Sequence, residues 1–372
     1  MTLKKVIIAP DSFKGSLSAK QVTDIIAQEM KTAFPDCTII KMPIADGGEG
    51  SVETIISTLG GTIHRAQVLS PDNRLISASF GITPNKIAVL EMAQSSGITK
   101  QLNLNPMTSN TYGFGQLISS ALDLGAIEFM LCIGGSATTD GGTGMAAALG
   151  VRFLDENENS FIPTGGTLSN IKQIDISGID NRIAESRFTV MCDVCNPLYG
   201  AAGAAFVYAP QKGATPEQVQ VLDAGLRSLS TILQDIKLEI TDLANIPGAG
   251  AAGGLGAGCI AFLSATLKSG IELILELCQF EKHINDTNLI ITGEGKLDSQ
   301  SFSGKVLSGI KRKSADVPII SICGICDYDK EELKANNVKA YEISKGIPIE
   351  QSLSNPEKYI RVATKKALSE LK

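Results

Sequence analysis

Apolar residues form short runs and helical spacings that alternate along the first part of the chain. The run from Val6 to Ala9 predicts a buried strand, and apolar side chains then recur at helical spacing from Ala19 to Met30. Ser18 and Gln21 fit a capping box at the start of that helix, and Pro35 ends it. A second strand in CTIIKMPI and a second amphipathic helix follow. The order strand, helix, strand, helix predicts a parallel sheet with both faces covered.

The C-terminal part repeats this pattern, whereas the middle differs. Strand-like runs at LIITG, VPIISIC and KAYEIS alternate with helical patterns near 304–314, near 330–336 and from Pro356. In the middle, RAQVLSPDNRLISASFGITPNKIAVLEMA holds three strand-like runs separated by turn signals, which favours antiparallel pairing. Two more helices are predicted near 113–124 and 216–236. We therefore predict an α/β domain made of 1–62 and 286–372, interrupted by a second α/β domain at 63–285.

Composition and charge exclude several classes of protein. The 372 residues are 43% hydrophobic, which is enough for a large core. The net charge is -6 and no basic stripe is present, so nucleic acid is not an expected partner and anions must be bound by local donors. No apolar run approaches the ~20 residues of a membrane helix, and the apolar start is too short for a signal peptide. We expect a cytoplasmic protein, monomeric or homodimeric, with no membrane partner.

The cysteines and histidines offer little catalytic chemistry. Two C-x-x-C pairs, at 192–195 and 323–326, could in principle build a zinc site. They are far apart, and each ends an apolar run, so we interpret them as reduced structural thiols in buried strands, with metal or redox use as the alternatives. The two histidines, His64 and His283, sit in no nucleophile turn, and G-x-S-x-G is absent.

The clearest functional pattern is the glycine-rich loop in FMLCIGGSATTDGGTGMAAALG. A predicted buried strand ends at Ile133, and a helix of small residues follows the loop. Glycines let backbone N–H groups approach phosphate oxygens, and a helix N-terminus adds favourable polarity. A plain strand–helix connection is the alternative, although so many glycines would weaken it. The predicted phosphate-binding residues are Gly134, Gly135, Ser136, Thr138, Thr139, Asp140, Gly141 and Gly142.

A second glycine-rich stretch, IPGAGAAGGLGAG, matches G-x-G-x-x-G at Gly248, Gly250 and Gly253. No clear strand precedes it, and it opens no βαβ unit, so it is not the dinucleotide fingerprint. We interpret it as a loop that lets another backbone or a ligand come close. The pattern G-x-x-x-x-G-K-[ST] is absent.

Polar clusters follow other predicted strands. They are Asp11–Ser12–Lys14, Asp46–Gly–Gly–Glu49, Asp193 to Asn196, Gln211–Lys212–Gly213, and Glu294 with Lys296, Asp298 and Ser299. Each has a structural alternative: a helix cap for Asp46 and Glu49, an Asx turn for Asp193, and an exposed ion pair for Lys296 with Asp298. Together they would crowd the carboxyl ends of several strands, which is where open α/β sheets bind ligands.

Six blocks of the chain, in order, resemble the signature blocks of the bacterial type I glycerate kinases. They are APDSFKGSLSA, PIADGGEGS, GGSATTDGGTGMAAALG, DVCNPLYGAAGAAFVYAPQKGA, PGAGAAGGLG and ITGEGKLDSQSFSGK. The similarity extends over nearly the whole chain. Thr139 stands where Asn is common. The resemblance implies ATP-dependent phosphorylation of D-glycerate, generally at the 2-hydroxyl, to give 2-phosphoglycerate and ADP. It also implies a flavodoxin-like parallel-sheet domain interrupted by an α/β domain with a restriction-endonuclease-like fold.

The implied fold predicts how the clusters meet. In a flavodoxin-like strand order of 2-1-3-4-5, the first strand lies beside the third, which would be LIITG. The loop at 11–14 would then face the loop at 294–299 in one crevice. The glycine loops of the inserted domain would close that crevice, so we expect phosphoryl transfer in an interdomain cleft.

Roles follow from the chemistry of the implied reaction. The carboxylate of glycerate needs cationic, hydroxyl or amide donors, and the candidates are Lys14, Lys296, Ser12, Ser299 and Asn196. The accepting hydroxyl needs a base or an orienting carboxylate; Asp193 is the first candidate and Asp11 the second. Mg²⁺ and lysines would neutralise the transferring phosphoryl group, with Lys14 and Lys296 among the catalytic residues. Candidate Mg²⁺ ligands, through water, are Asp46, Glu49 and Asp298. The loop at 134–142 would hold the ATP phosphates.

Three other functions stay open at this stage. The same fold and loops are compatible with 3-phosphorylation of glycerate, because both hydroxyls lie on one three-carbon skeleton. A non-catalytic flavodoxin-like protein that binds a small acid would not need both a phosphate loop and spare carboxylates. A flavin-binding electron carrier would need aromatic stacking, yet the chain has no Trp and only 5% aromatic residues.

Overall fold

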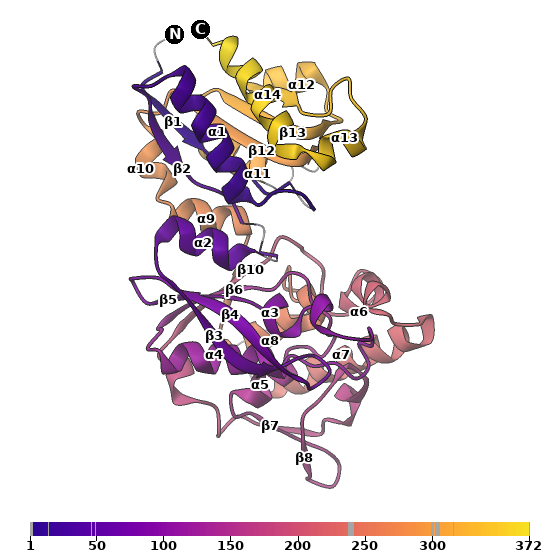
Figure 1. Ribbon diagram of the computed structural model, residues 1–372. Coiled ribbons are helices and arrows are strands. Elements are labelled where there is room, and N and C mark those ends of the chain that lie inside the picture. Colours follow the sequence, from indigo (N-terminus) through magenta and orange to yellow (C-terminus); the bar gives the residue numbers. More distant parts are fainter. Residues whose placement is uncertain are drawn as a thin grey trace. The chain divides into compact units, whose positions relative to one another are not determined.

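The structure is a computed structural model that describes residues 3–13, 15–45, 47–48, 50–236, 242–298, 301, 306–314 and 316–371. It is a mixed α/β protein built on parallel sheets (Figure 1). Two compact units are found: unit 1 comprises Met1–Asp46, Ser57–Leu59 and Ser269–Lys372, and unit 2 comprises Gly47–Ile56 and Gly60–Lys268. Each unit is described by itself. The predicted domain boundaries, after residues 62 and 285, stay a prediction.

Unit 1 is built on a five-stranded parallel sheet in the order β14-β13-β12-β1-β2. Its strands are β1 (Lys5–Ile8), β2 (Thr38–Lys41), β12 (Leu289–Leu297), β13 (Ile319–Cys326) and β14 (Val338–Glu342). Its helices are α1 (Ala19–Ala33), α9 (Gly270–Leu277), α10 (Phe280–Ile284), α11 (Val306–Lys313), α12 (Lys330–Ala335), α13 (Ile349–Ser354) and α14 (Pro356–Ser369). Val6 pairs with Leu289, which confirms that the first strand lies beside LIITG.

One core of unit 1 forms where α1 and α14 cover the same face of the sheet (Figure 1). Ile26 of α1, Ile360 of α14 and Ile8 of β1 are completely buried there, and burying each such side chain stabilises the fold by roughly 1.5–3 kcal/mol. The predicted capping box at the start of α1 is confirmed, with the Ser18 side chain accepting from the Gln21 N–H. This packing fixes the position at which β1 ends and its polar loop begins.

Unit 2 is built on a six-stranded mixed sheet in the order β11-β10-β6-β5-β4-β3 and a small antiparallel sheet, β8-β7-β9. Its strands are β3 (Thr62–Leu69), β4 (Leu75–Ile82), β5 (Ile87–Glu91), β6 (Glu128–Cys132), β7 (Arg152–Leu154), β8 (Ser160–Phe161), β9 (Gln173–Asp175), β10 (Arg187–Met191) and β11 (Thr266–Lys268). Its helices are α2 (Ser51–Leu59, whose last three residues group with unit 1), α3 (Ala93–Ser96), α4 (Tyr112–Asp123), α5 (Thr143–Ala148), α6 (Ala204–Tyr208), α7 (Pro216–Ile236) and α8 (Ala251–Leu263).

The sheet of unit 2 changes direction at β5. The pairs β3–β4 and β4–β5 are antiparallel, as the turn signals predicted, whereas β5, β6, β10 and β11 run parallel. Two apolar clusters pack this unit, one with α4 against the sheet and the other around α6 and α7. Because parallel strands end at the same edge, the loops after β6 and β10 are brought together.

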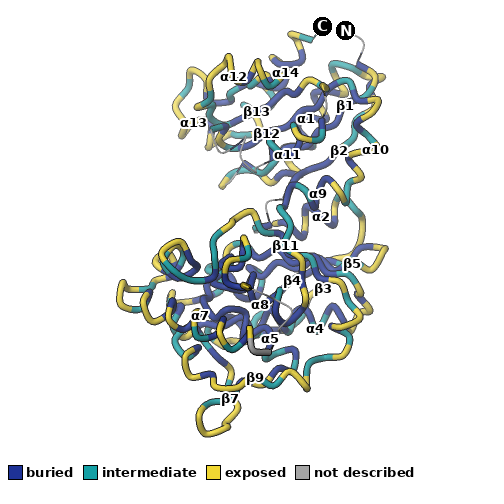
Figure 2. The backbone as a smooth tube through the Cα atoms, turned by 180° about the vertical axis from the view of Figure 1, so that it is seen from behind, coloured by how far each residue is buried: buried dark blue, intermediate teal, exposed yellow. Residues whose placement is uncertain are grey.

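The predicted burial of the C-x-x-C cysteines is only partly right. Figure 2 shows β13 largely in the dark blue of buried residues. Cys323 is buried in this strand, and Cys326, at its end, is half-buried. Cys192 is also half-buried, and Cys195 is exposed, because β10 stops at Met191 and the second cysteine of that pair lies in the loop beyond it. All eight cysteines are described and carry free thiols. Of the described helices, none combines the length and apolar character needed to cross a membrane.

Candidate active site

In unit 2 three of the predicted blocks meet at the carboxyl ends of the parallel strands. The glycine-rich loop follows β6, and its first N–H, that of Gly134, donates to the carbonyl of Gly47 (3.1 Å). Gly47 belongs to the ADGGEG block, and a Cβ atom placed on it would lie 3.3 Å from the Cβ of Met191, the last residue of β10. The backbone at Gly47 therefore lies between the glycine-rich loop and the end of β10. The predicted metal ligands of this block, Asp46 and Glu49, lie outside the described residues.

The second glycine-rich stretch supports the first by close backbone contact. Ala252, Gly253 and Gly254 all have left-handed φ angles (53°, 70° and 88°), which interrupt α8 near its start. The carbonyl of Gly253 accepts from the N–H of Gly141 (3.0 Å). A Cβ on Gly253 would lie 2.0 Å from the carbonyl oxygen of Thr138, so only glycine fits. This confirms the interpretation of the stretch as a loop that another backbone approaches.

Asp140 holds the C-terminal half of the glycine-rich loop from inside. Its Oδ2 accepts from the N–H and Oγ1–H of Thr111 (both 2.8 Å) and from the N–H of Gly144 (3.1 Å), and its Oδ1 accepts from the N–H of Gly142 (3.4 Å). Burial raises the pKa of Asp140, and these hydrogen bonds oppose that rise. The N–H groups at the start of α5 are thus engaged by the protein. The hydrogen bonds of Asp140 leave out segment 135–139, in which Gly135 is exposed and residues 136–139 are buried.

Lys212 belongs to a polar cluster to which the sequence assigned no role, and it lies in a 3-10 turn after α6 and not after a strand as predicted. Its ammonium is buried and donates to Ser136 Oγ (2.8 Å) and to the carbonyl of Thr138 (2.5 Å). Burial lowers its pKa to about 7, against the opposing charge of Asp140. The hydroxyls of Thr138 and Thr139 are fully buried and have no hydrogen-bond partner among the described residues. A cation thus contacts the segment that the sequence predicts to bind phosphate.

The loop after β10 presents Asp193. Asp193 is exposed, whereas the side-chain amide of Asn196 donates to the carbonyl of Ala202 (2.8 Å) and accepts from the hydroxyl of Tyr208 (2.6 Å). The N–H of Gly250 donates to the carbonyl of Asn196 (3.0 Å) and ties the loop to the second glycine-rich stretch. Asn196 therefore shapes the loop, and a substrate contact from it would compete with these bonds.

In unit 1 the first loop lies beside β12, as predicted. The N–H of Asp11 donates to the carbonyl of Gly293 (2.8 Å), and the hydroxyl of Thr292 donates to the carbonyl of Ala9 (2.8 Å). The carboxylate of Asp11 accepts from the N–H of Ser12 (2.6 Å), which shapes the turn after β1. Lys14 and Ser299, the other candidates of these two loops, lie outside the described residues.

The loop after β12 is held by a buried carboxylate. Glu294 accepts from the hydroxyl of Ser301 (2.9 Å). The same Ser301 Oγ accepts from the N–H of Asp298 (3.1 Å). Lys296 lies in the exposed part of this segment, with Nζ 2.9 Å from the carboxylate of Asp327 and 4.0 Å from that of Asp298. Asp327 raises the pKa of Lys296, so this ammonium stays charged at neutral pH.

Comparison with known proteins identifies the family. The chain matches the model of the glycerate kinase family over residues 6–372. It belongs to the glycerate kinase family. It is 41% identical to the glycerate kinase of Bacillus subtilis (strain 168), over 96% of this chain and 94% of that protein, and 43% identical to the glycerate 2-kinase of Escherichia coli (strain K12), over 86% and 85%. A crystal structure of a Salmonella typhimurium LT2 protein that carries the provisional name glycerate kinase 2 is 37% identical, with a TM-score of 0.87 over 99% of this chain and 98% of that one.

As a member of the glycerate kinase family, the protein is a kinase. A glycerate kinase must supply hydrogen-bond donors for the phosphate oxygens of ATP and for the carboxylate of glycerate. Each unit has one set of neighbouring loops with candidate donors, called here its loop group. The group in unit 2 consists of the segment 135–139 over Lys212 and the loop of Asp193. The group in unit 1 consists of the loop after β1 and the exposed segment around Lys296.

Replacing Lys296 with methionine tests the anion-binding role of the group in unit 1. An exposed ion pair contributes only ~0–1 kcal/mol to stability, so Lys296→Met should unfold within a degree or two of wild type. Loss of a charge-assisted hydrogen bond should raise the KM for glycerate about tenfold or more. Lys282→Met is the matched control, because Lys282 is exposed and its ammonium donates to Gln279. An unchanged KM for glycerate would remove Lys296 from the substrate site.

Proposed function

We propose that this glycerate kinase family member transfers the γ-phosphoryl group of ATP to the 2-hydroxyl of D-glycerate, giving 2-phosphoglycerate and ADP. The observation that carries the proposal is the 43% identity to a protein named glycerate 2-kinase over 86% of this chain. Two loop groups at carboxyl ends of parallel strands support it, because this is where such sheets bind ligands. The buried cation behind segment 135–139 supplies charge for a polyphosphate.

The roles of the site residues are part of this proposal. Asp193 accepts the proton of the 2-hydroxyl as that oxygen attacks the γ-phosphorus, the bond to the ADP oxygen breaks, and ADP leaves. Asp11 is the second candidate for this role. Segment 135–139 binds ATP phosphate oxygens, and Lys212 holds that segment in place. The carboxylate of glycerate takes donors from Ser12, Lys14, Lys296, Ser299 and Asn196.

Mg²⁺ is the expected partner of ATP, and it would neutralise charge on the phosphates. Its predicted ligands are Asp46, Glu49 and Asp298, of which only Asp298 is described. No three His, Cys, Asp or Glu side chains gather as a metal site within the described ranges. The described residues therefore do not make up a fitting Mg²⁺ site, and no step above depends on one.

We also propose folds for the two units. Numbered within unit 1, the sheet order is 2-1-3-4-5, the order of flavodoxin-like proteins. For unit 2, the restriction-endonuclease-like fold comes from the resemblance alone. Cytoplasmic location, a monomeric or dimeric state and an interdomain position for the reaction remain predictions.

A coupled assay of ADP release tests the function directly. We expect release only when D-glycerate and ATP are both present, with little with L-glycerate, and a ³¹P NMR spectrum of 2-phosphoglycerate. A spectrum of 3-phosphoglycerate would favour the alternative hydroxyl. ADP release that does not depend on glycerate, or glycerate binding without any release, would contradict the proposal, and the second result would indicate a binding protein.

Asp193→Asn tests the assigned base. The amide keeps the shape of the carboxylate but cannot accept the proton, so we expect kcat to fall ~10²-fold with the KM for ATP nearly unchanged. Asp123→Asn is the matched control, since Asp123 in the same unit is an exposed partner of Arg182. Turnover of Asp193→Asn within threefold of wild type would exclude both a base and an orienting role.

A further inference from the structure

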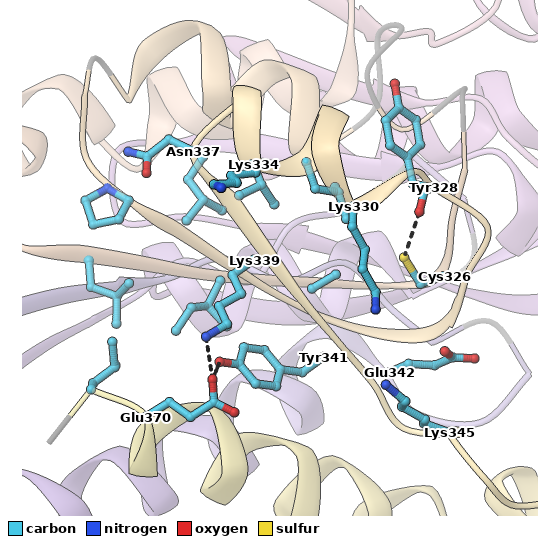
Figure 3. A pocket seen from close by; sticks show the side chains of 18 of the residues that line it. Cys326, Tyr328, Lys330, Lys334, Asn337, Lys339, Tyr341, Glu342, Lys345 and Glu370 are labelled. Carbon is cyan, nitrogen blue, oxygen red and sulfur yellow. Dashed lines mark hydrogen bonds and ion pairs between the residues drawn. The ribbon is translucent and has the colours of Figure 1, made fainter.

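A cavity of about 710 Å³ lies along β14, the edge strand of unit 1 (Figure 3). Residues of β13, β14, α12 and the end of the chain line it. Its volume falls within the range of small-molecule sites, about 300–1,000 Å³. None of the functional candidates described above lines this cavity.

The rim of the cavity is cationic. Four lysines line it, Lys330, Lys334, Lys339 and Lys345, against two glutamates, Glu342 and Glu370. Figure 3 shows Lys339 and the Tyr341 hydroxyl bound to the same Glu370 carboxylate. Within the described part of the chain, the other three lysines form no ion pair. A local excess of positive charge in a chain of net charge -6 is complementary to an anion.

The floor of the cavity is apolar. Leu289, Ile319, Ile320, Leu333 and Val338 line it and are buried in the fold. An inorganic anion would leave this apolar surface unused, whereas an organic anion with a flat apolar body could cover it and still reach the lysines. Lysine ammonium groups bind phosphate and carboxylate as point charges.

We propose that this cavity binds an organic anion in which a flat apolar group carries a phosphate or carboxylate. The same cavity wall reaches the candidate active site of unit 1. Cys326 and Tyr328 line the cavity, and Asp327, between them, forms the 2.9 Å ion pair with Lys296. The Cys326 thiol also donates to the carbonyl of Tyr328 (4.0 Å), which closes a tight turn around Asp327. A ligand that moves this turn changes the position of Lys296, so binding regulates the kinase; this second part rests on the proposed function.

Calorimetric titration with 1-naphthyl phosphate tests the binding. We expect a dissociation constant on the order of 100 µM for a probe of this size. Inorganic phosphate, which lacks the apolar body, and 1-naphthol, which lacks the charge, should each bind at least tenfold more weakly. Saturating ATP should not displace 1-naphthyl phosphate, whereas D-glycerate should change the affinity for the probe by the same factor by which the probe changes the affinity for glycerate. Displacement by ATP would place the probe in the nucleotide site and overturn the proposal.

The double variant Lys330→Glu/Lys334→Glu assigns the binding to this cavity. Both side chains are exposed and neither belongs to the candidate active site, so folding and basal turnover should stay within twofold of wild type. Affinity for 1-naphthyl phosphate should fall at least tenfold. Lys358→Glu is the control for charge, because Lys358 is exposed in the same unit and does not line the cavity. Equal affinities of the double variant and wild type would overturn the proposal.

Steady-state kinetics test the regulation separately. In wild type, saturating 1-naphthyl phosphate should change the KM for glycerate at least threefold, and in the double variant it should have no effect. Binding without a kinetic effect would overturn the regulatory role. If the protein released no ADP with glycerate, the proposed function would fail, while the calorimetric result would still decide whether the cavity is a binding site.

Discussion

A Lys212→Met enzyme is expected to lose ~10²–10³-fold in kcat/KM for ATP, because misplacing a phosphate-binding segment by an ångström or removing one donor has effects of that size. Methionine has nearly the length of lysine but donates no hydrogen bond. Segment 135–139 would keep its backbone bonds to Ser96 and Ile98 but lose the two bonds from the ammonium, to Ser136 Oγ and to the carbonyl of Thr138. The charge behind the segment would disappear as well. Steady-state kinetics with varied ATP at saturating glycerate measure the loss.

The pH dependence separates a charge effect from a purely structural one. With a pKa of about 7, Lys212 loses its proton as pH rises through neutrality in the free enzyme, and kcat/KM reports on the free enzyme. We expect kcat/KM for ATP to decline from pH 6 to pH 8 in wild type and to lack this decline in Lys212→Met.

Stability should change with pH in the opposite sense. Because the pKa of Lys212 is lowered in the folded protein, the unfolded chain binds more protons between about pH 7 and the ordinary lysine pKa of 10.5. The contribution of this group to stability therefore rises with pH across that window and is constant below it. Lys212→Met should show a flatter dependence of unfolding free energy on pH between 7 and 10.

Lys172→Met provides the control for loss of a lysine in the same unit, since Lys172 is exposed. It should match wild type in kcat/KM and in both pH profiles. A Lys212→Met enzyme that folds, keeps its KM for ATP and retains the wild-type pH profile would show that Lys212 does not act on the nucleotide.

The helices and strands were largely predictable from local sequence patterns. The strand order made one part of the candidate site predictable, the contact of the loop after β1 with β12. The helix at 216–236 is found at those residues, because proline at its first turn and regular apolar spacing are local signals. The contact between the first loop and β12 followed from the flavodoxin-like strand order that the resemblance to glycerate kinases implied, so Asp11 was expected beside the segment of Glu294. The geometry in each unit is consistent with these expectations.

Lys212 and the interior of the glycine-rich loop depended on information that the sequence does not display. Lys212 contacts Ser136 across 76 positions of the chain, and nothing in QKG distinguishes a buried lysine from an exposed one. Likewise, DGGTG after a strand is typical of a phosphate loop, but the carboxylate of Asp140 turns inward to the N–H groups of that loop. Which donors stay available to a ligand depends on tertiary packing. Asp140 is thus better explained as a structural residue than as a direct phosphate contact.

Asp140→Ala is expected to lower the free energy of unfolding by about 3–5 kcal/mol, because several buried donors lose their acceptor and each unsatisfied donor costs roughly 1–3 kcal/mol. The donors are the N–H and hydroxyl of Thr111 and the N–H of Gly144, with the N–H of Gly142 at longer distance. Urea unfolding followed by circular dichroism measures the change. Activity should be lost together with stability, since the same hydrogen bonds shape the glycine-rich loop that follows β6.

Asp140→Asn distinguishes an acceptor from a charge. The amide oxygen can still accept from Thr111 and Gly144, and only the weak 3.4 Å bond from Gly142 must be given up, so the free energy of unfolding of this variant should fall by only ~1–2 kcal/mol.

Thr111→Val removes one donor from the same carboxylate oxygen of Asp140. The losses from Thr111→Val and Asp140→Ala should then be non-additive in the double variant, because Thr111→Val removes a donor that Asp140→Ala has already left without its acceptor. Additive losses would show that the Asp140–Thr111 contact carries no stability, and a fully stable Asp140→Ala protein without activity would return Asp140 to the phosphate-binding residues.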